Sequence, residues 1–160
     1  MANWDINNDL INGDELLLYL TSGQTVLAYA TSVSIQVDSE TIDTSSKFSC
    51  RWASNLGGRA SYTISADALY CDSEQGISFD GLLELMVLGE TVDWYVGREA
   101  AHDGSCETNP HTLDTTAQYY TGKAIVSSVS LNAGSNEIAS CSISLTGAGE
   151  IIINNGTAGE

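Results

Sequence analysis

The sequence has few basic side chains, one proline and no long apolar run, and each shortage excludes a class of protein. Five Lys and Arg against 21 Asp and Glu give a net charge of −16. Tight binding to nucleic acid or to an anionic membrane needs a basic footprint, so this charge argues against both. One proline excludes a proline-rich chain. The longest apolar stretches, Leu16–Leu20 and Leu82–Leu88, are too short to span a bilayer.

Signals for export and paired cysteines are also missing. The first ten residues have neither the positive nor the apolar region of a secretory signal. The four cysteines, Cys50, Cys71, Cys106 and Cys141, include no Cys-x-x-Cys pair. We therefore expect four reduced thiols in a cytosolic compartment rather than two disulfides.

The composition is that of one folded domain. Hydrophobic residues make up 42% of the 160, and only 16% are charged, which is not a disordered composition. Much of the polarity is uncharged, with 20 Ser and 14 Thr. No internal repeat or linker divides the chain, so we expect a single domain over residues 1–160.

Apolar and polar residues alternate along most of the chain, which predicts half-buried strands. Val33, Ile35 and Val37, for example, alternate with Ser34, Gln36 and Asp38. The predicted strands are Glu15–Leu20, Thr25–Ala30, Thr31–Asp38, Ala60–Ala68, Thr91–Gly97, Tyr119–Leu131, Ile138–Thr146 and Glu150–Asn154.

One helix and two long loops interrupt the strands. Ser78 is a good N-cap and Gly89 a plausible C-cap, and Phe79, Leu82 and Met86 repeat at helical spacing between them, so we expect a helix over residues 78–88. Residues 43–59 and 99–118 are predicted to be loops, and loops of that length are usually functional or mobile.

The sequence offers no convincing catalytic or cofactor site. Asp5, Asn7 and Asp9 resemble the start of a calcium loop, but Leu10 and Leu16 stand where a glycine and a glutamate are required. His102, Cys106 and His111 match no zinc spacing and lack a fourth ligand. There is no Gly-x-Ser-x-Gly nucleophile motif or glycine-rich phosphate loop. We expect no enzyme activity, no metal and no cofactor.

Two features of the sequence point to a function beyond that of an ordinary folded domain. Several strands carry small hydroxyl side chains on their polar face instead of Lys, Glu and Arg; these faces are either ordinary solvated sheet or parts of one smooth, non-adhesive surface. Lys47, Arg51 and Arg59 lie within 13 residues, in a loop that also holds Phe48 and Trp52. Aromatic and Arg residues are enriched at interface cores, so this loop is either a chance cluster or a contact with a second acidic copy.

The chain resembles the major tail tube protein of long, non-contractile bacteriophage tails. The resemblance rests on the order of five stretches that cover most of the chain, whereas residues 99–118 match poorly and look like an insertion. The matching stretches are NGDELLLYL (12–20), ATSVSIQVDSETIDTSSK (30–47), GRASYTISADALY (58–70), FDGLLELMVLGETVDWYVG (79–97) and YYTGKAIVSSVSLNAGSNEIASCSISLTGAGEI (119–151).

The resemblance implies a mainly β fold, a sandwich or open barrel flanked by one helix. It further implies hexameric rings whose inner sheets join into a closed barrel, and rings that stack into a hollow virion tail assembled in the host cytoplasm. Genomic DNA passes through the tube without specific binding. The implied partners are other copies and the tail terminator, tape measure and baseplate proteins. The ring-to-ring contacts would come from the arm at 1–11, the loop at 43–59 and the tail at 154–160.

Two sets of candidate residues follow. The lumen-facing candidates are Ser32, Ser34, Gln36, Asp38, Ser61, Thr63, Ser65, Ser140, Ser142 and Ser144. The interface candidates are Trp4, Lys47, Phe48, Arg51, Trp52 and Arg59. Two alternatives are a tube protein of a bacterial contractile injection system and a monomeric all-β module that binds carbohydrate through exposed tryptophans; Trp94, on an apolar strand face, is predicted to be core.

Overall fold

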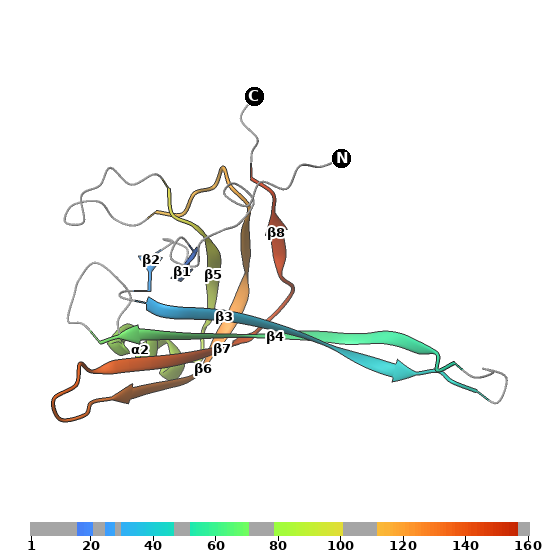
Figure 1. The fold of residues 1–160 in the computed structure, drawn as a ribbon, viewed down its shortest axis with the longest axis horizontal. Helices are drawn as coiled ribbons and strands as arrows, with labels where there is room; N and C mark the ends of the chain where they lie inside the picture. The colour runs from blue at the N-terminus through green and yellow to red at the C-terminus, as the bar shows by residue number, and fades with distance from the viewer. Residues whose placement is uncertain are drawn as a thin grey trace.

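The computed structural model describes residues 16–20, 25–27, 30–46, 52–70, 79–100 and 112–156, which form one curled antiparallel sheet and one helix (Figure 1). In chain order the elements are β1 (Leu16–Leu20), β2 (Thr25–Val26), β3 (Ala30–Asp43), β4 (Asn55–Leu69), α2 (Phe79–Leu88), β5 (Thr91–Arg98), β6 (Tyr119–Asn132), β7 (Ser140–Gly147) and β8 (Ile152–Asn154). The mainly β fold with one flanking helix confirms the predicted fold class.

The sheet folds over on itself because β6 serves both halves. The strand order is β2-β1-β5-β6-β7-β4-β3, and β8 pairs with the start of β6. The first half of β6 pairs with β5 as far as Ile125, and the second half pairs with β7 from Ala124 onward. A register shift between Val126 and Ser128 lies at this junction, and such bulges bend a strand. In Figure 1, β5 and β8 run roughly upright, whereas β3, β4 and β7 run across the view.

The core lies between the two halves of the curled sheet. Leu18 and Trp94 come from one half, Ile64 and Leu145 from the other, and Leu82 of α2 closes the space; all five side chains are fully buried. The predicted core position of Trp94 is confirmed. Burial of alternate residues leaves the opposite side of each strand facing outward, and that outward side carries the polar residues.

The helix ends as the sequence predicts. Gly89 has φ 66°, and its N–H donates to the carbonyls of Leu85 and Met86 at 3.1 and 3.2 Å. A left-handed glycine at this point is the usual end of a helix, so the predicted C-cap is confirmed. The predicted N-cap, Ser78, lies outside the described residues. At ten residues, α2 is too short to cross a membrane, and no other helix occurs in the described ranges.

Both predicted loops are more ordered at their ends than expected. The loop at 43–59 was predicted too long, because Asn55–Arg59 belong to β4 and the first three of them, residues 55–57, pair with the end of β3 as far as Asp43. At the base of the segment 99–118, Glu99 bridges Leu113, and the N–H of Asp114 donates to the carbonyl of Arg98 at 2.9 Å. Strand pairing therefore continues into regions whose composition suggests loops.

Candidate assembly surfaces

One outward face of the sheet carries mostly small hydroxyl side chains. Paired residues of antiparallel strands project to the same face, so the register sets the rows of this face. One row runs from Ser34 to Ser65, Ser144 and Ser128, and the next from Ser32 to Asp67, Ser142 and Ser130. We call the surface formed by β3, β4, β7 and the second half of β6 the hydroxyl face.

The structure brings the predicted lumen-facing residues together on this one surface. Gln36 pairs with Thr63 and Asp38 with Ser61, which extends the rows, and Ser140 lies at the far end of β7 on the same side. Asp67, Ser128 and Ser130 also belong to this face, although they are not among the predicted lumen-facing residues. A signal existed for the two serines, since they alternate with Val129 and Leu131 in β6.

Asp67 lies at the centre of the hydroxyl face and is held by its neighbours. Ser142 donates to Asp67 Oδ1 at 2.6 Å, and Ser32 donates to Oδ2 at 2.9 Å, so the carboxylate bridges three strands. These hydrogen bonds, that of Ser142 above all, lower the pKa of Asp67 below its ordinary value of 3.8. The carboxylate therefore stays ionised and, with Asp38, adds negative charge to a surface that otherwise carries uncharged side chains.

The hydroxyl face ends at two open strand edges. On one side, β3 is the last of the described strands. On the other side, β6 pairs with β5 only as far as Ile125, so its second half has no neighbour there among the described strands. Open edges present unpaired N–H and C=O groups and invite pairing with another chain. This face therefore has two places where another strand can add.

Beyond the face, β3 and β4 continue as a two-stranded ribbon. In chain order, pairing of β4 with β7 begins at Thr63. Before that point β4 pairs only with β3, through residues 55–57 and 60–62 on either side of a register shift. Figure 1 shows the ribbon projecting far from the other strands. Near its tip Ile42 pairs with Leu56, and both are exposed, while Trp52 is 86% exposed. These apolar side chains of the ribbon therefore face solvent and not the core of the subunit.

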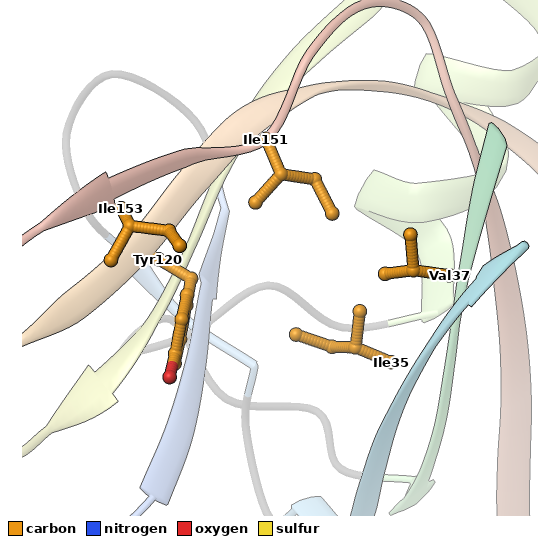
Figure 2. A pocket seen from close by; sticks show the side chains of 5 residues that line it. All are labelled: Ile35, Val37, Tyr120, Ile151 and Ile153. Carbon is orange, nitrogen blue, oxygen red and sulfur yellow. The ribbon is translucent and has the colours of Figure 1, made fainter. Parts of the chain in front are cut away.

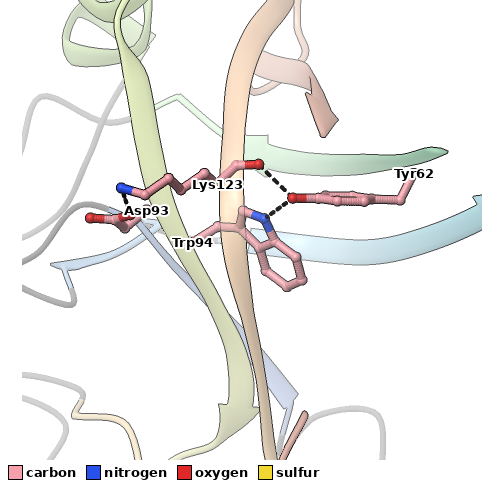
Figure 3. A network of polar contacts seen from close by, with 4 residues as sticks. All are labelled: Tyr62, Asp93, Trp94 and Lys123. Atoms are coloured by element: carbon pink, nitrogen blue, oxygen red, sulfur yellow. Dashed lines mark hydrogen bonds and ion pairs between the residues drawn. The ribbon is translucent and has the colours of Figure 1, made fainter. Parts of the chain in front are cut away.

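Tyr62 fastens the root of this ribbon to β6. Its hydroxyl donates to the backbone carbonyl of Lys123 and accepts the indole N–H of Trp94 at 3.1 Å (Figure 3). The two rings meet edge to face, with centroids 5.6 Å apart. A Cβ on Gly147 would lie 2.5 Å from the Tyr62 ring, so only glycine leaves it room. The nearby Lys123–Asp93 pair, at 3.0 Å, is exposed and adds little.

An apolar groove opens between β3 and β8. It has a volume of about 390 Å³ and is lined by Ile35, Val37, Tyr120, Ile151 and Ile153, whose side chains converge on one hollow in Figure 2. A second hollow of about 450 Å³ shares Val37 and Ile151 and reaches Tyr62. Val37 and Ile153 are more than half exposed. We call the hollow in Figure 2 the β3 groove. From the sequence, its residues were expected only to lie on the faces of strands.

The predicted interface residues are only partly within the described ranges. Trp52 and Arg59 are exposed, Trp52 near the ribbon tip and Arg59 on β4 rather than in a loop as predicted. Trp4, Lys47, Phe48 and Arg51 lie outside the described residues. The same holds for His102, Cys106 and His111, and across the ranges described no cluster of His, Cys, Asp or Glu has the arrangement of a metal site.

Comparison with known proteins identifies relatives of this fold. Residues 10–152 match the family model of the phage tail tube protein. No curated protein sequence matches the chain. Among solved structures, a chain of the virion of a native gene transfer agent particle is 21% identical, with a TM-score of 0.70, and the match covers 90% of this chain and 98% of that one.

Two further solved structures share the fold at lower identity. A chain of the SPP1 tail tube is 11% identical, with a TM-score of 0.63, and the match covers 91% of this chain and 80% of that one. A chain from the sheath–tube complex of an extracellular contractile injection system, PVC, is 15% identical, with a TM-score of 0.61, covering 92% and 93%. At these identities the likeness concerns the fold.

Proposed function

Because the chain belongs to the phage tail tube protein family, we propose that its copies close into six-membered rings and that these rings stack into a hollow tube for genomic DNA. The role is structural rather than catalytic. The single observation that carries the proposal is the hydroxyl face, a smooth surface bounded by two open strand edges.

The strand directions support closure of the ring. β6, β7, β4 and β3 alternate in direction across the hydroxyl face. In a ring, every copy presents its sheet in the same direction, so the β3 edge of one copy meets the β6 edge of the next in antiparallel orientation. The alternation then continues around the ring, and closure removes the edges that would otherwise aggregate.

The chemistry of the hydroxyl face suits a channel for DNA. Proteins that hold DNA neutralise its phosphates with Lys and Arg. In β3, β4, β7 and β6 from Ala124 onward, the only cation is Arg59, which lies on the ribbon beyond the face. A lining of Ser and Thr with the carboxylates of Asp38 and Asp67 gives the polyanion nothing to bind, so DNA slides through.

Stacking of the rings falls to the ribbon tip and the chain ends. Trp52 serves as the apolar anchor, and Arg51 and Arg59 pair with acidic side chains of the next ring. Lys47, Phe48 and Trp4 join this contact, together with the arm at 1–11 and the tail at 154–160. The exposure of Trp52, Ile42 and Leu56 supports the assignment, because apolar surface of this kind often marks a site that is buried against another protein.

The assembled tube would form in the host cytoplasm and meet three other kinds of tail protein. A terminator protein would close one end, a baseplate protein the other, and a tape measure protein would occupy the bore during assembly. The two end proteins would contact the stacking surface of the terminal ring, which the ribbon tip and the chain ends form. The tape measure protein would contact the hydroxyl face.

Electron microscopy of the purified protein tests the proposal. We expect filaments with a central hole at near-neutral pH. Persistent monomers would contradict it, and monomers that bind glycans would favour a carbohydrate-binding module instead. A tube that carries protein rather than DNA would be recognised by co-purifying protein cargo in particles from the producing cells.

A further inference from the structure

The β3 groove is built from side chains that the fold itself leaves half covered. On β4, the inward-facing Tyr62, Ile64 and Ala66 are buried, because the other half of the sheet lies over them. On the neighbouring β3, Val33 and Ile35 are only half-buried and Val37 is 58% exposed. The second layer therefore stops short of the edge strand, and the described residues cover the inward side of β3 only in part.

A second uncovered apolar surface lies on α2. Leu82, Leu85 and Met86 face the core. Leu83 and Val87, one turn apart on an adjacent side of the helix, are 37% and 76% exposed. We call these two residues the α2 flank. A helix of one isolated subunit would normally carry polar residues there, as it does at Asp80 and Glu84.

The two surfaces occupy opposite edges of one sheet, on the same side of it. α2 packs chiefly against β6, the strand that bounds the hydroxyl face on one edge, and its Leu82 lies in the core. The β3 groove lies at the other edge, also on the core side, since it is lined by Ile35 and Val37 rather than by Ser34 and Gln36. Within one subunit, β7 and β4 lie between β6 and β3 in the strand order.

We propose that the α2 flank of one copy docks into the β3 groove of the next copy in the ring. The inference rests on the proposed ring and specifies its contact. When the β6 edge of one copy pairs with the β3 edge of its neighbour, the helix above β6 is carried over the uncovered side of β3. Two aliphatic side chains enter a hollow lined by aliphatic side chains, and both surfaces lose water.

A charge exchange tests this contact. Val37→Glu places a carboxylate against the α2 flank and its neighbour Glu84, so tube yield should fall at least about tenfold. Val87→Lys should lower it less, because a lysine stem packs on apolar surface while its amine reaches water. The double variant pairs the new charges across the interface and should recover most of the yield. Both sites are exposed in the single subunit, so its melting temperature should not change.

The outcomes separate this contact from the ring itself. If wild-type protein forms no rings, the proposed function fails and the contact with it. If wild-type tubes form and Val37→Glu assembles equally well, or the double variant recovers nothing, the ring stands and the docking contact is overturned.

Cross-linking provides a second test of the docking contact, and this test does not require the charge variants to fold. Tubes of Val37→Cys/Val87→Cys treated with a short bis-maleimide should yield covalent ladders of up to six chains on a denaturing gel. The control, Ser34→Cys/Val87→Cys, keeps one thiol on β3 but on the opposite face of the sheet from Val37, and should give only the background of the four natural cysteines. Equal ladders from both would overturn the contact.

Discussion

Tyr62 is the residue on which the ribbon depends most directly. It is 4% exposed, and its hydroxyl is the acceptor for the buried indole N–H of Trp94 and a donor to the backbone of β6. A buried donor left without a partner costs free energy, whereas an exposed one recovers hydrogen bonds with water. The position of the ribbon relative to β6 is therefore tied to one hydroxyl group.

Tyr62→Phe should lower the free energy of unfolding of the subunit by about 1–3 kcal/mol, because it leaves the Trp94 N–H unsatisfied. Denaturant unfolding of disassembled subunits measures the change. Tyr120→Phe is the matched control, since Tyr120 is 36% exposed and should lose less than about 0.5 kcal/mol. Equal losses in the two variants would show that the hydrogen bonds of the Tyr62 hydroxyl add no more to the free energy of unfolding than those of an exposed tyrosine.

Asp67 gives the hydroxyl face a dependence on pH. Its pKa in the folded chain lies below the ordinary value of 3.8, through hydrogen bonds from Ser142 and Ser32. Ionised Asp67 therefore stabilises the fold at pH above about 3.8, and this contribution is lost as the pH falls through the lower pKa of the folded state.

Asp67→Asn should accordingly melt at a lower temperature than wild type at pH 6, and the difference should shrink below pH 3.8. Thermal melts across this range measure it. Ser130→Ala serves as the control, because the Ser130 hydroxyl donates to a backbone carbonyl rather than to the carboxylate. A melting difference between wild type and Asp67→Asn that stays constant with pH would contradict the assignment.

At the scale of elements, alternation predicted the strands of the sheet well and the ribbon poorly. Ser34 and Ile35 alternate clearly enough that β3 and its two faces follow from the sequence alone. Asn55–Arg59 contain Gly57 and Gly58, which favour turns, so the sequence indicates a loop there. These residues nevertheless form strand because the end of β3 lies beside them and pairs with the first three of them. The pattern within one segment cannot show that such a partner strand is available.

The ribbon is expected to act in assembly and not in folding. Arg59→Glu combined with Arg51→Glu should leave the melting temperature of the subunit unchanged and stop growth at single rings or monomers, because the reversed charges repel the acidic neighbouring ring. Size-exclusion chromatography and electron microscopy measure the two states. Arg59→Lys, which keeps the charge, should still form tubes; unaltered tube length in the reversed variant would refute the pairing.

The whole molecule carries a charge that opposes its own assembly. At −16 per subunit, copies repel one another, and the proposed basic contacts near the ribbon tip offset only part of this. The Debye length falls from about 30 Å at 0.01 M to about 8 Å at 0.15 M salt, which weakens long-range repulsion more than short contacts.

Assembly should therefore quicken as ionic strength rises over this range. Light scattering after dilution from a dissociated state measures the rate. A screening effect depends on ionic strength alone, so NaCl and KCl at equal concentration should act alike. Slower growth at higher salt would show that attractive ion pairs govern the rate instead.

Some features of the whole molecule were outside the reach of its sequence pattern. Period-two alternation identified Ser142 and Ser32 as outward-facing, but not that Asp67 would bridge them across three strands. Nor did it indicate that Val37, inward-facing by pattern, would remain 58% exposed. That exposure depends on how far the other half of the sheet extends over β3, which alternation within β3 does not indicate.

In the proposed tube, the hydroxyl face lines the bore. A cryo-electron microscopy reconstruction of filaments grown from the purified protein would show this face in place. We expect six-membered rings with Ser34, Ser65, Ser142 and Ser128 facing the central channel and β3 paired to β6 of the next copy. Filaments with this face on the outer surface, or without a channel, would contradict it.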